Sequence, residues 1–135
     1  MQEESYGVIP LSKEKGYWEV FLIQHKENGY WGFPKGHGEL DEGAKEAAFR
    51  ELKEETNLEL DSLIQEEPLL EQYSFIKEKQ RVFKTVYYFV ATVKGEVRLQ
   101  VQEIYDGKWL PLTEAHQQLT HKEGKAILVA ARSLL

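Results

Sequence analysis

Apolar residues occur along the chain in short runs separated by polar turns. Two runs near the N-terminus, residues 6–11 and 17–24, are rich in β-branched and aromatic residues and predict a pair of strands across the polar turn 12–16. The same pattern predicts further strands later in the chain, over residues 71–76, 81–93 and 107–110. No segment is long or flexible enough to divide the chain, so one domain over residues 1–135 is expected.

Strong helix formers without a breaker fill residues 44–56 (AKEAAFRELKEET) and predict a helix. Asn57 is expected to end it in a left-handed cap, where Asn replaces Gly. Shorter helices are predicted over residues 111–119 and 122–135, whereas three glycines and a proline predict irregular structure over residues 31–38. One helix among the strands and others at the end indicate an α/β fold with a mixed sheet covered by helices.

The amino-acid composition limits the kinds of molecule that the protein is expected to bind. The formal net charge of −6 argues against binding to duplex nucleic acid, which depends on Lys and Arg neutralising phosphates. The chain has no cysteine and no basic-then-apolar leader, and its longest apolar run, residues 86–93, is too short to span a bilayer. A cytoplasmic, monomeric protein with no membrane partner is therefore expected. A phosphorylated small molecule stays compatible with the acidic charge, because a bound cation can supply the positive field.

The acidic residues of the predicted helix lie in unexpected positions. At ~100° per residue, Glu51 and Glu55 fall on the same face as Ala44 and Ala48. Two carboxylates one turn apart on a partly buried face repel each other and lose hydration, unless a cation lies between them. Mg²⁺ is a natural candidate, because it prefers oxygen ligands and shares them with phosphates. From geometry alone, a solvated Glu/Lys-rich helix is an equally good interpretation.

The segment 36–58, GHGELDEGAKEAAFRELKEETNL, resembles the Nudix box, with Asn57 in place of the second Gly of the pattern. The resemblance implies the Nudix fold, an α/β/α sandwich around a mixed β-sheet, and hydrolysis of a nucleoside diphosphate linked to another moiety. It implies that Mg²⁺, or Mn²⁺ in its place, is bound by Gly36, Glu51, Glu54 and Glu55. It further implies that Arg50 orients Glu51, that Glu54 is a ligand or the general base, and that Glu42 is structural.

Two flanking runs resemble the asymmetrical bis(5′-nucleosyl)-tetraphosphatases, with bacterial members, including chlamydial ones, most similar. These runs are WGFPKGH at residues 31–37 and KTVYYF at residues 84–89. The resemblance implies cleavage of diadenosine tetraphosphate to ATP and AMP. It implies substrate binding by Lys35, His37, Lys84 and Tyr88, with His121 where relatives often carry a base-stacking aromatic, and a catalytic or metal-binding role for Glu103.

Simpler interpretations stay open for these residues. Tyr88 could be a core aromatic, Lys84 an edge-strand charge and Glu103 an exposed loop acid. The alternative enzyme is a Nudix pyrophosphohydrolase acting on RNA 5′ ends or on nucleoside triphosphates. A nucleotide sensor without activity and a purely structural domain are the non-enzymatic alternatives. The intact set of Glu51, Glu54 and Glu55 argues against the sensor.

Overall fold

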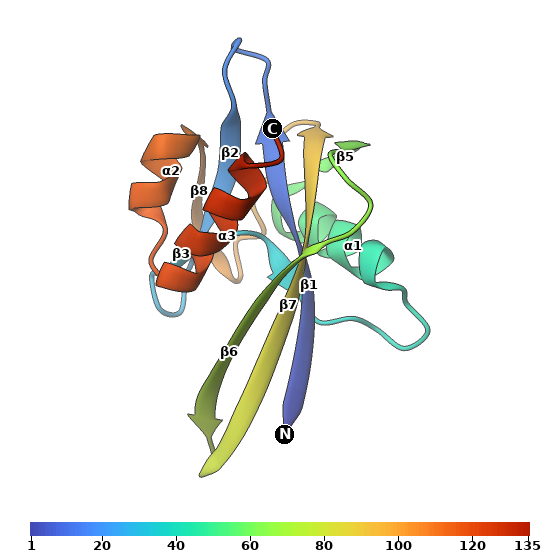
Figure 1. The fold of residues 1–135 in the computed structure, drawn as a ribbon, viewed down its shortest axis with the longest axis vertical. Helices are drawn as coiled ribbons and strands as arrows, with labels where there is room; N and C mark the ends of the chain where they lie inside the picture. Colours follow the sequence, from blue (N-terminus) through green and yellow to red (C-terminus); the bar gives the residue numbers. More distant parts are fainter.

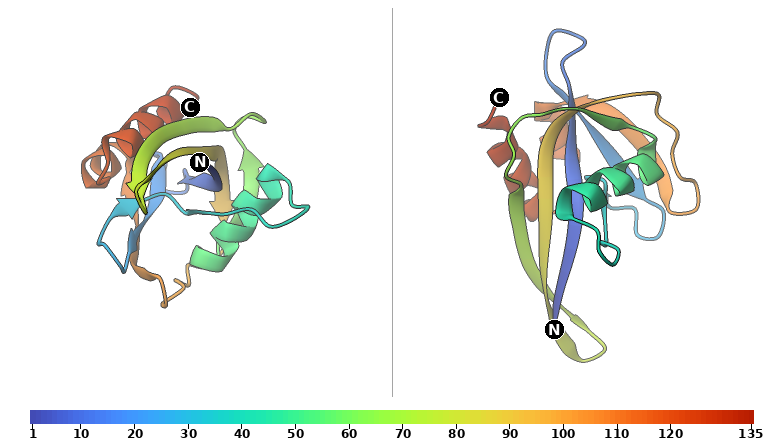
Figure 2. Two further views of the ribbon diagram at one scale, coloured as in Figure 1. Left: turned by 90° about the horizontal axis from the view of Figure 1, so that it is seen from below. Right: turned by 90° about the vertical axis from the view of Figure 1, so that its right-hand side faces the viewer.

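Eight strands form one mixed sheet in the computed structural model, which describes residues 1–135. Helix α1 (Ala44–Thr56) covers one face, and α2 (Leu112–Gln118) and α3 (Lys122–Arg132) lie on the other side (Figures 1 and 2). The strands are β1 (Gln2–Ser12), β2 (Glu19–His25), β3 (Trp31–Gly32), β4 (Lys35–Gly36), β5 (Glu59–Leu63), β6 (Leu69–Lys77), β7 (Gln80–Lys94) and β8 (Ile104–Pro111). The expected α/β/α sandwich is confirmed.

The centre of the sheet is the parallel pair β1 and β7, which stay in register from Gln2 opposite Phe83 to Leu11 opposite Thr92. All other pairings are antiparallel, with β6 and β5 along β7 and with β2 next to β1. Strand β2 pairs with β1 only at Leu11 and Ser12, and β4 pairs with β1 farther back, opposite Tyr6 and Gly7. The sheet therefore divides beside β1, and β4 lies in the division.

Alternate residues of β7 pack into two separate hydrophobic cores. Val86, Tyr88 and Val90 face α2 and α3, while Phe89 and Ala91 face α1. This period of two is what a strand with both faces covered requires. The near-continuous apolar run at residues 86–93 therefore results from the burial of both faces of β7.

Helix α1 packs on the sheet through Ala47, Ala48 and Leu52, all fully buried. The bounds of this helix match the prediction, and Asn57 caps it in the left-handed conformation at φ 69°. Its Nδ2 also donates a 2.8 Å hydrogen bond to the carbonyl of Glu96. The predicted small-residue face is therefore the packed face.

Several other elements differ from the prediction in their bounds, and some observed strands were not predicted. Strand β5 was not predicted, and the segment predicted to be irregular contains the two-residue strands β3 and β4. The last helix ends at Arg132 rather than at Leu135, and the predicted strand 107–110 begins three residues earlier, at Ile104. No helix of the structure combines the length and apolar character needed to cross a membrane.

Candidate active site

Strand β4 brings the backbone of Gly36 against the carboxylate of Glu51 on α1. A Cβ added to Gly36 would overlap the Glu51 carboxylate carbon and both of its oxygens. Only glycine permits this approach, because any larger residue would push the side chain of Glu51 away. The structure therefore brings together two of the four predicted metal ligands.

Arg50 holds the neighbouring acids in place. Its Nε and Nη2 donate to the two oxygens of Glu42 at 2.6 and 3.0 Å, and Nη2 also donates to the carbonyl of His37 at 2.9 Å. Its Nη1 donates to Glu51 Oε1 at 3.0 Å and to Glu54 Oε1 at 3.1 Å. The fork geometry of a guanidinium suits such multiple contacts. Glu42 thus has the predicted structural contact at the junction of loop and helix, and its hydrogen bonds from Arg50 lower its pKa.

Glu55, one turn beyond Glu51, is 5% exposed, and its Oε1 atom has no hydrogen-bond partner. Burial, and next the charge of Glu51, raise the pKa of Glu55 to about 8. An unpaired buried carboxylate is costly unless a cation or proton neutralises it. The side chains alone do not form a ready three-ligand cluster. The contact of Gly36 with Glu51 and the unpaired oxygen of Glu55 nevertheless fit a divalent cation at this end of α1.

Glu103 lies near these acids, although it is far from them in sequence. The backbone N–H of Gln100 donates to the carbonyl of Glu55 at 3.0 Å, and Gln100 Oε1 accepts a hydrogen bond from the N–H of Glu103 at 2.9 Å. Burial raises the pKa of both Glu51 and Glu55, and the negative charge of Glu103 adds to the rise. The loop before β8 thus places another carboxylate near the site.

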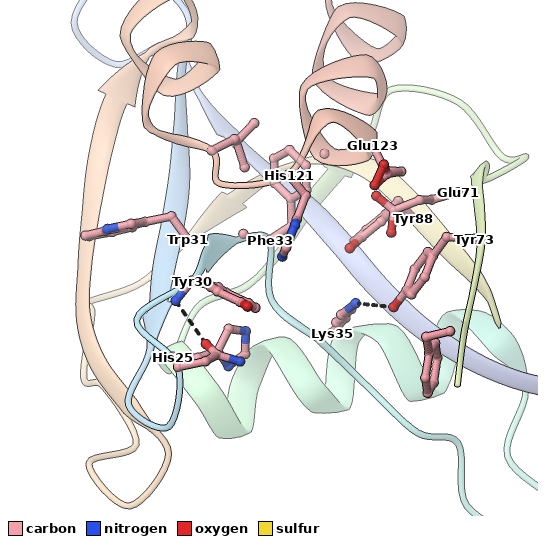
Figure 3. A pocket seen from close by; sticks show the side chains of 15 residues that line it. His25, Tyr30, Trp31, Phe33, Lys35, Glu71, Tyr73, Tyr88, His121 and Glu123 are labelled. Carbon is pink, nitrogen blue, oxygen red and sulfur yellow. Dashed lines mark hydrogen bonds between the residues drawn. The ribbon is translucent and has the colours of Figure 1, made fainter. Parts of the chain in front are cut away.

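A cavity of about 580 Å³ opens beside this cluster, between β6, β7 and the start of α3 (Figure 3). Aromatic rings from four separate segments line it: Tyr30, Trp31 and Phe33 before β4, Tyr73 and Phe75 on β6, and Tyr88 on β7, with His121 just before α3. Tyr30 and His121 meet edge to face with ring centroids 4.6 Å apart. A cavity of this size with mostly apolar walls suits a planar organic ligand.

Lys35 connects the cavity to the acids of α1. Its Nζ donates to the hydroxyl of Tyr73 at 3.4 Å and lies 5.7 Å from the centre of that ring (Figure 3). Burial lowers the pKa of Lys35, while the charges of Glu71 and then Glu55 raise it. The charge of this one ammonium group therefore acts on Glu71 in the cavity and on Glu55 of the helix, without a salt bridge to either. Gly7 permits this path, since a Cβ there would meet Pro34, Lys35 and Tyr88.

The other residues predicted to contact the substrate differ in their exposure and in whether they line the cavity. Tyr88 lines the cavity but is only 3% exposed and packs edge-on against Phe33 with centroids 5.4 Å apart. Lys84 is 8% exposed, does not line the cavity, and its Nζ lies 3.4 Å from Glu3. His37 is exposed, with Nδ1 3.4 Å from the carbonyl of Glu4. His121 lines the cavity.

Sequence reasoning missed several cavity residues, above all Tyr30, Tyr73, Glu71 and Glu123. Tyr73 and Glu71 carried a usable signal, because they alternate with exposed residues on β6 and therefore face the packed side. Tyr30 and Glu123 lie in a loop and at a helix start, where no periodicity marks their direction. The placement of Glu123 depends on how α3 packs against β6.

Comparisons with known proteins agree with this arrangement. The family model described as NUDIX domain matches residues 1–131. An asymmetrical bis(5′-nucleosyl)-tetraphosphatase from Rattus norvegicus is 37% identical over 120 residues, covering 85% of this chain and 80% of the rat protein.

Two solved structures share the fold. A binary complex of a C. elegans Ap4A hydrolase superimposes with a TM-score of 0.72 at 23% identity, covering 97% of this chain and 95% of that one. The NUDIX domain of Shewanella oneidensis NrtR, complexed with ADP ribose, gives a TM-score of 0.78 at 19% identity, covering 98% and 88%.

Proposed function

The chain belongs to the NUDIX domain family, as a Nudix hydrolase similar to asymmetrical bis(5′-nucleosyl)-tetraphosphatases, and we propose that it cleaves diadenosine tetraphosphate to ATP and AMP. One observation carries the proposal. Lys35 lines the aromatic cavity, and its charge acts both on Glu71 in the cavity and on Glu55 of α1, whose Oε1 atom has no hydrogen-bond partner. A ligand with a planar base at one end and several phosphates at the other matches that order of groups.

We further propose that Gly36, Glu51, Glu54 and Glu55 hold Mg²⁺ or Mn²⁺. The donor set is one of hard oxygen atoms, which these cations prefer. When bound, the cation supplies Lewis acidity, which activates water and neutralises charge on the phosphates. The buried, unpaired oxygen of Glu55 is the feature that a cation would satisfy.

The residues of the chain have distinct tasks in this proposal. Arg50 keeps the carboxylates of Glu51 and Glu54 in fixed orientations, at 3.0 and 3.1 Å from its Nη1. Glu54 and Glu103 are the carboxylates available to accept a proton from the attacking water, because neither is buried. Lys35 neutralises phosphate charge at the point where the substrate passes from the cavity to α1.

The cavity would hold one nucleoside of the substrate. Base stacking on aromatic side chains tolerates different bases and contributes ~1–3 kcal/mol per base. The rings of Tyr30, Tyr73 and His121 are more exposed than Tyr88 and are therefore better placed to meet a base. Lys84 and His37 stay proposed contacts for the more distant phosphates.

Initial rates on a substrate panel would test the proposal. With Mg²⁺ present, kcat/KM for diadenosine tetraphosphate should exceed that for triphosphorylated RNA and for a damaged nucleoside triphosphate by at least tenfold. A higher kcat/KM on either competitor would reject the proposed substrate while leaving the Nudix chemistry in place. Binding of diadenosine tetraphosphate without turnover of any panel member would indicate a nucleotide sensor.

A further inference from the structure

The polar end of the aromatic cavity is formed by Glu71, for which the catalytic proposal gives no role. Glu71 faces the same side of β6 as Leu69, Tyr73 and Phe75, so a carboxylate interrupts an otherwise apolar stripe. It is 8% exposed and lines the cavity, yet it forms no hydrogen bond or ion pair within the protein. A buried carboxylate without a partner lowers stability, so its presence points to a ligand.

Glu123 brings a second carboxylate to the same end of the cavity. It lies in the first turn of α3, and its Oε2 atom is buried without a hydrogen-bond partner. Figure 3 shows Glu71 and Glu123 close together beside the hydroxyl of Tyr88, and burial and then the charge of Glu123 act to raise the pKa of Glu71. The charges of Lys35 and His121 act to lower the pKa of Glu71, but neither residue makes a salt bridge to either acid, and Lys35 donates instead to Tyr73.

The chemistry of this end restricts the ligand group that fits it. Carboxylate oxygens accept hydrogen bonds, so the matching group must present N–H or O–H donors. The surrounding walls are aromatic, and the ammonium group of Lys35 donates its hydrogen bond to Tyr73 rather than to either acid. A phosphate would be repelled by the two acids, whereas the amino-bearing edge of a stacked base would meet both requirements.

We propose that Glu71, assisted by Glu123, recognises the amino group of an adenine held in this cavity and makes the protein discriminate against hypoxanthine, in which a carbonyl replaces that amino group. The inference rests on the proposed function for the kind of ligand, and it adds the residues that select the base. A carbonyl facing Glu71 would bring two acceptors together, which is a repulsive contact.

Equilibrium binding of AMP and IMP to the full-length protein, followed by calorimetry, tests this inference. The wild type should bind AMP about 10- to 100-fold more tightly than IMP, the range expected for a hydrogen bond to a charged acceptor. Glu71→Gln should reduce the ratio to near one, because an amide can donate to the hypoxanthine carbonyl. Glu67→Gln is the matched control: Glu67 is exposed and four residues earlier, and its variant should keep the wild-type ratio.

The remaining outcomes are equally clear. An unchanged ratio in Glu71→Gln, or absence of AMP binding, would overturn the inference. Equal weakening of AMP and IMP would assign Glu71 to the ribose hydroxyls and would also overturn it. A thermal melt of Glu71→Gln at or above the wild-type Tm shows that the variant is folded. If AMP selectivity depends on Glu71 while diadenosine tetraphosphate is not cleaved, the inference stands and the proposed function fails.

Discussion

Two glutamates on one face of α1 have opposite surroundings. Glu51 accepts a hydrogen bond from Arg50 at 3.0 Å, whereas Glu55, one turn later, has a buried oxygen with no partner. The difference follows from position, because Arg50 adjoins Glu51 and its guanidinium reaches across the helix start toward Glu42. Glu55 is instead buried, where its charge acts on Lys35. Each residue therefore makes a separate prediction.

Replacing Glu55 by Gln should stabilise the metal-free protein and remove part of its pH dependence. The folded pKa of about 8 lies above the ordinary value of 4.5, so the folded state binds more protons between these values and loses stability as pH rises through them. One pKa unit corresponds to about 1.4 kcal/mol. Thermal melts in EDTA should show a higher Tm for Glu55→Gln than for the wild type at pH 8, with little difference at pH 4.5.

Added Mg²⁺ provides the second half of this test. It should raise the Tm of the wild type at pH 8 and have a much smaller effect on Glu55→Gln. Glu46→Gln is the matched control, because Glu46 lies on the exposed side of the same helix. A Tm of Glu55→Gln below that of the wild type in EDTA would contradict the account of an unneutralised buried charge.

Arg50→Lys should lower both activity and stability, although the charge is kept. An ammonium group cannot contact Glu42 bidentately and also reach Glu51, Glu54 and the carbonyl of His37. We expect kcat to fall about 10- to 100-fold, as for residues that orient metal ligands. The free energy of unfolding, from urea titration, should fall by roughly 1–3 kcal/mol. An unchanged kcat would show that Arg50 does not position the acids.

Glu51→Gln separates the catalytic interpretation from a purely structural one. A structural helix would be neutral or more stable after the change, because repulsion with Glu55 disappears. The catalytic interpretation also expects the fold to be kept, and it predicts that kcat on diadenosine tetraphosphate falls by several orders of magnitude. Circular dichroism and initial rates on the same sample distinguish the two, and retained activity would favour the structural role.

At the level of elements, the end of α1 depends on the left-handed backbone of Asn57. Asn57→Ala should lower the free energy of unfolding by about 1–2 kcal/mol, the cost of that conformation for an ordinary residue. Asn57→Gly, which restores the usual residue of the Nudix box, should stay close to the wild type despite losing the 2.8 Å bond to Glu96. Equal losses in both variants, measured by urea titration, would assign the role to the side-chain bond instead.

Elements with a local signal were predicted well, and those held by distant partners were not. Helix α1 has breaker-free helix formers and a capping Asn, so its bounds follow from the sequence. Strand β5 exposes Glu59, Asp61 and Ser62 and depends on pairing with β7, so alternation in the sequence is weak there. The short strands β3 and β4 form because β2 and β1 offer free edges to a segment rich in glycine.

For the molecule as a whole, the sequence indicates the acids but not the cavity beside them. Those acids share one helix, where a 3.6-residue period fixes which side chains lie together. The cavity is assembled from segments between His25 and Gly124 that meet only after β1 pairs with β7 and α3 packs on β6. Its aromatic walls and the acids Glu71 and Glu123 therefore required the structure.

In the proposed function, the α1 acids and the aromatic cavity act together on one dinucleoside polyphosphate. The most direct test of this function is product analysis of diadenosine tetraphosphate incubated with the protein and Mg²⁺, with nucleotides separated by anion-exchange chromatography. ATP and AMP should form in equal amounts, with no reaction in EDTA. Two ADP per substrate, or no turnover by a protein that hydrolyses another nucleotide, would contradict the proposed function.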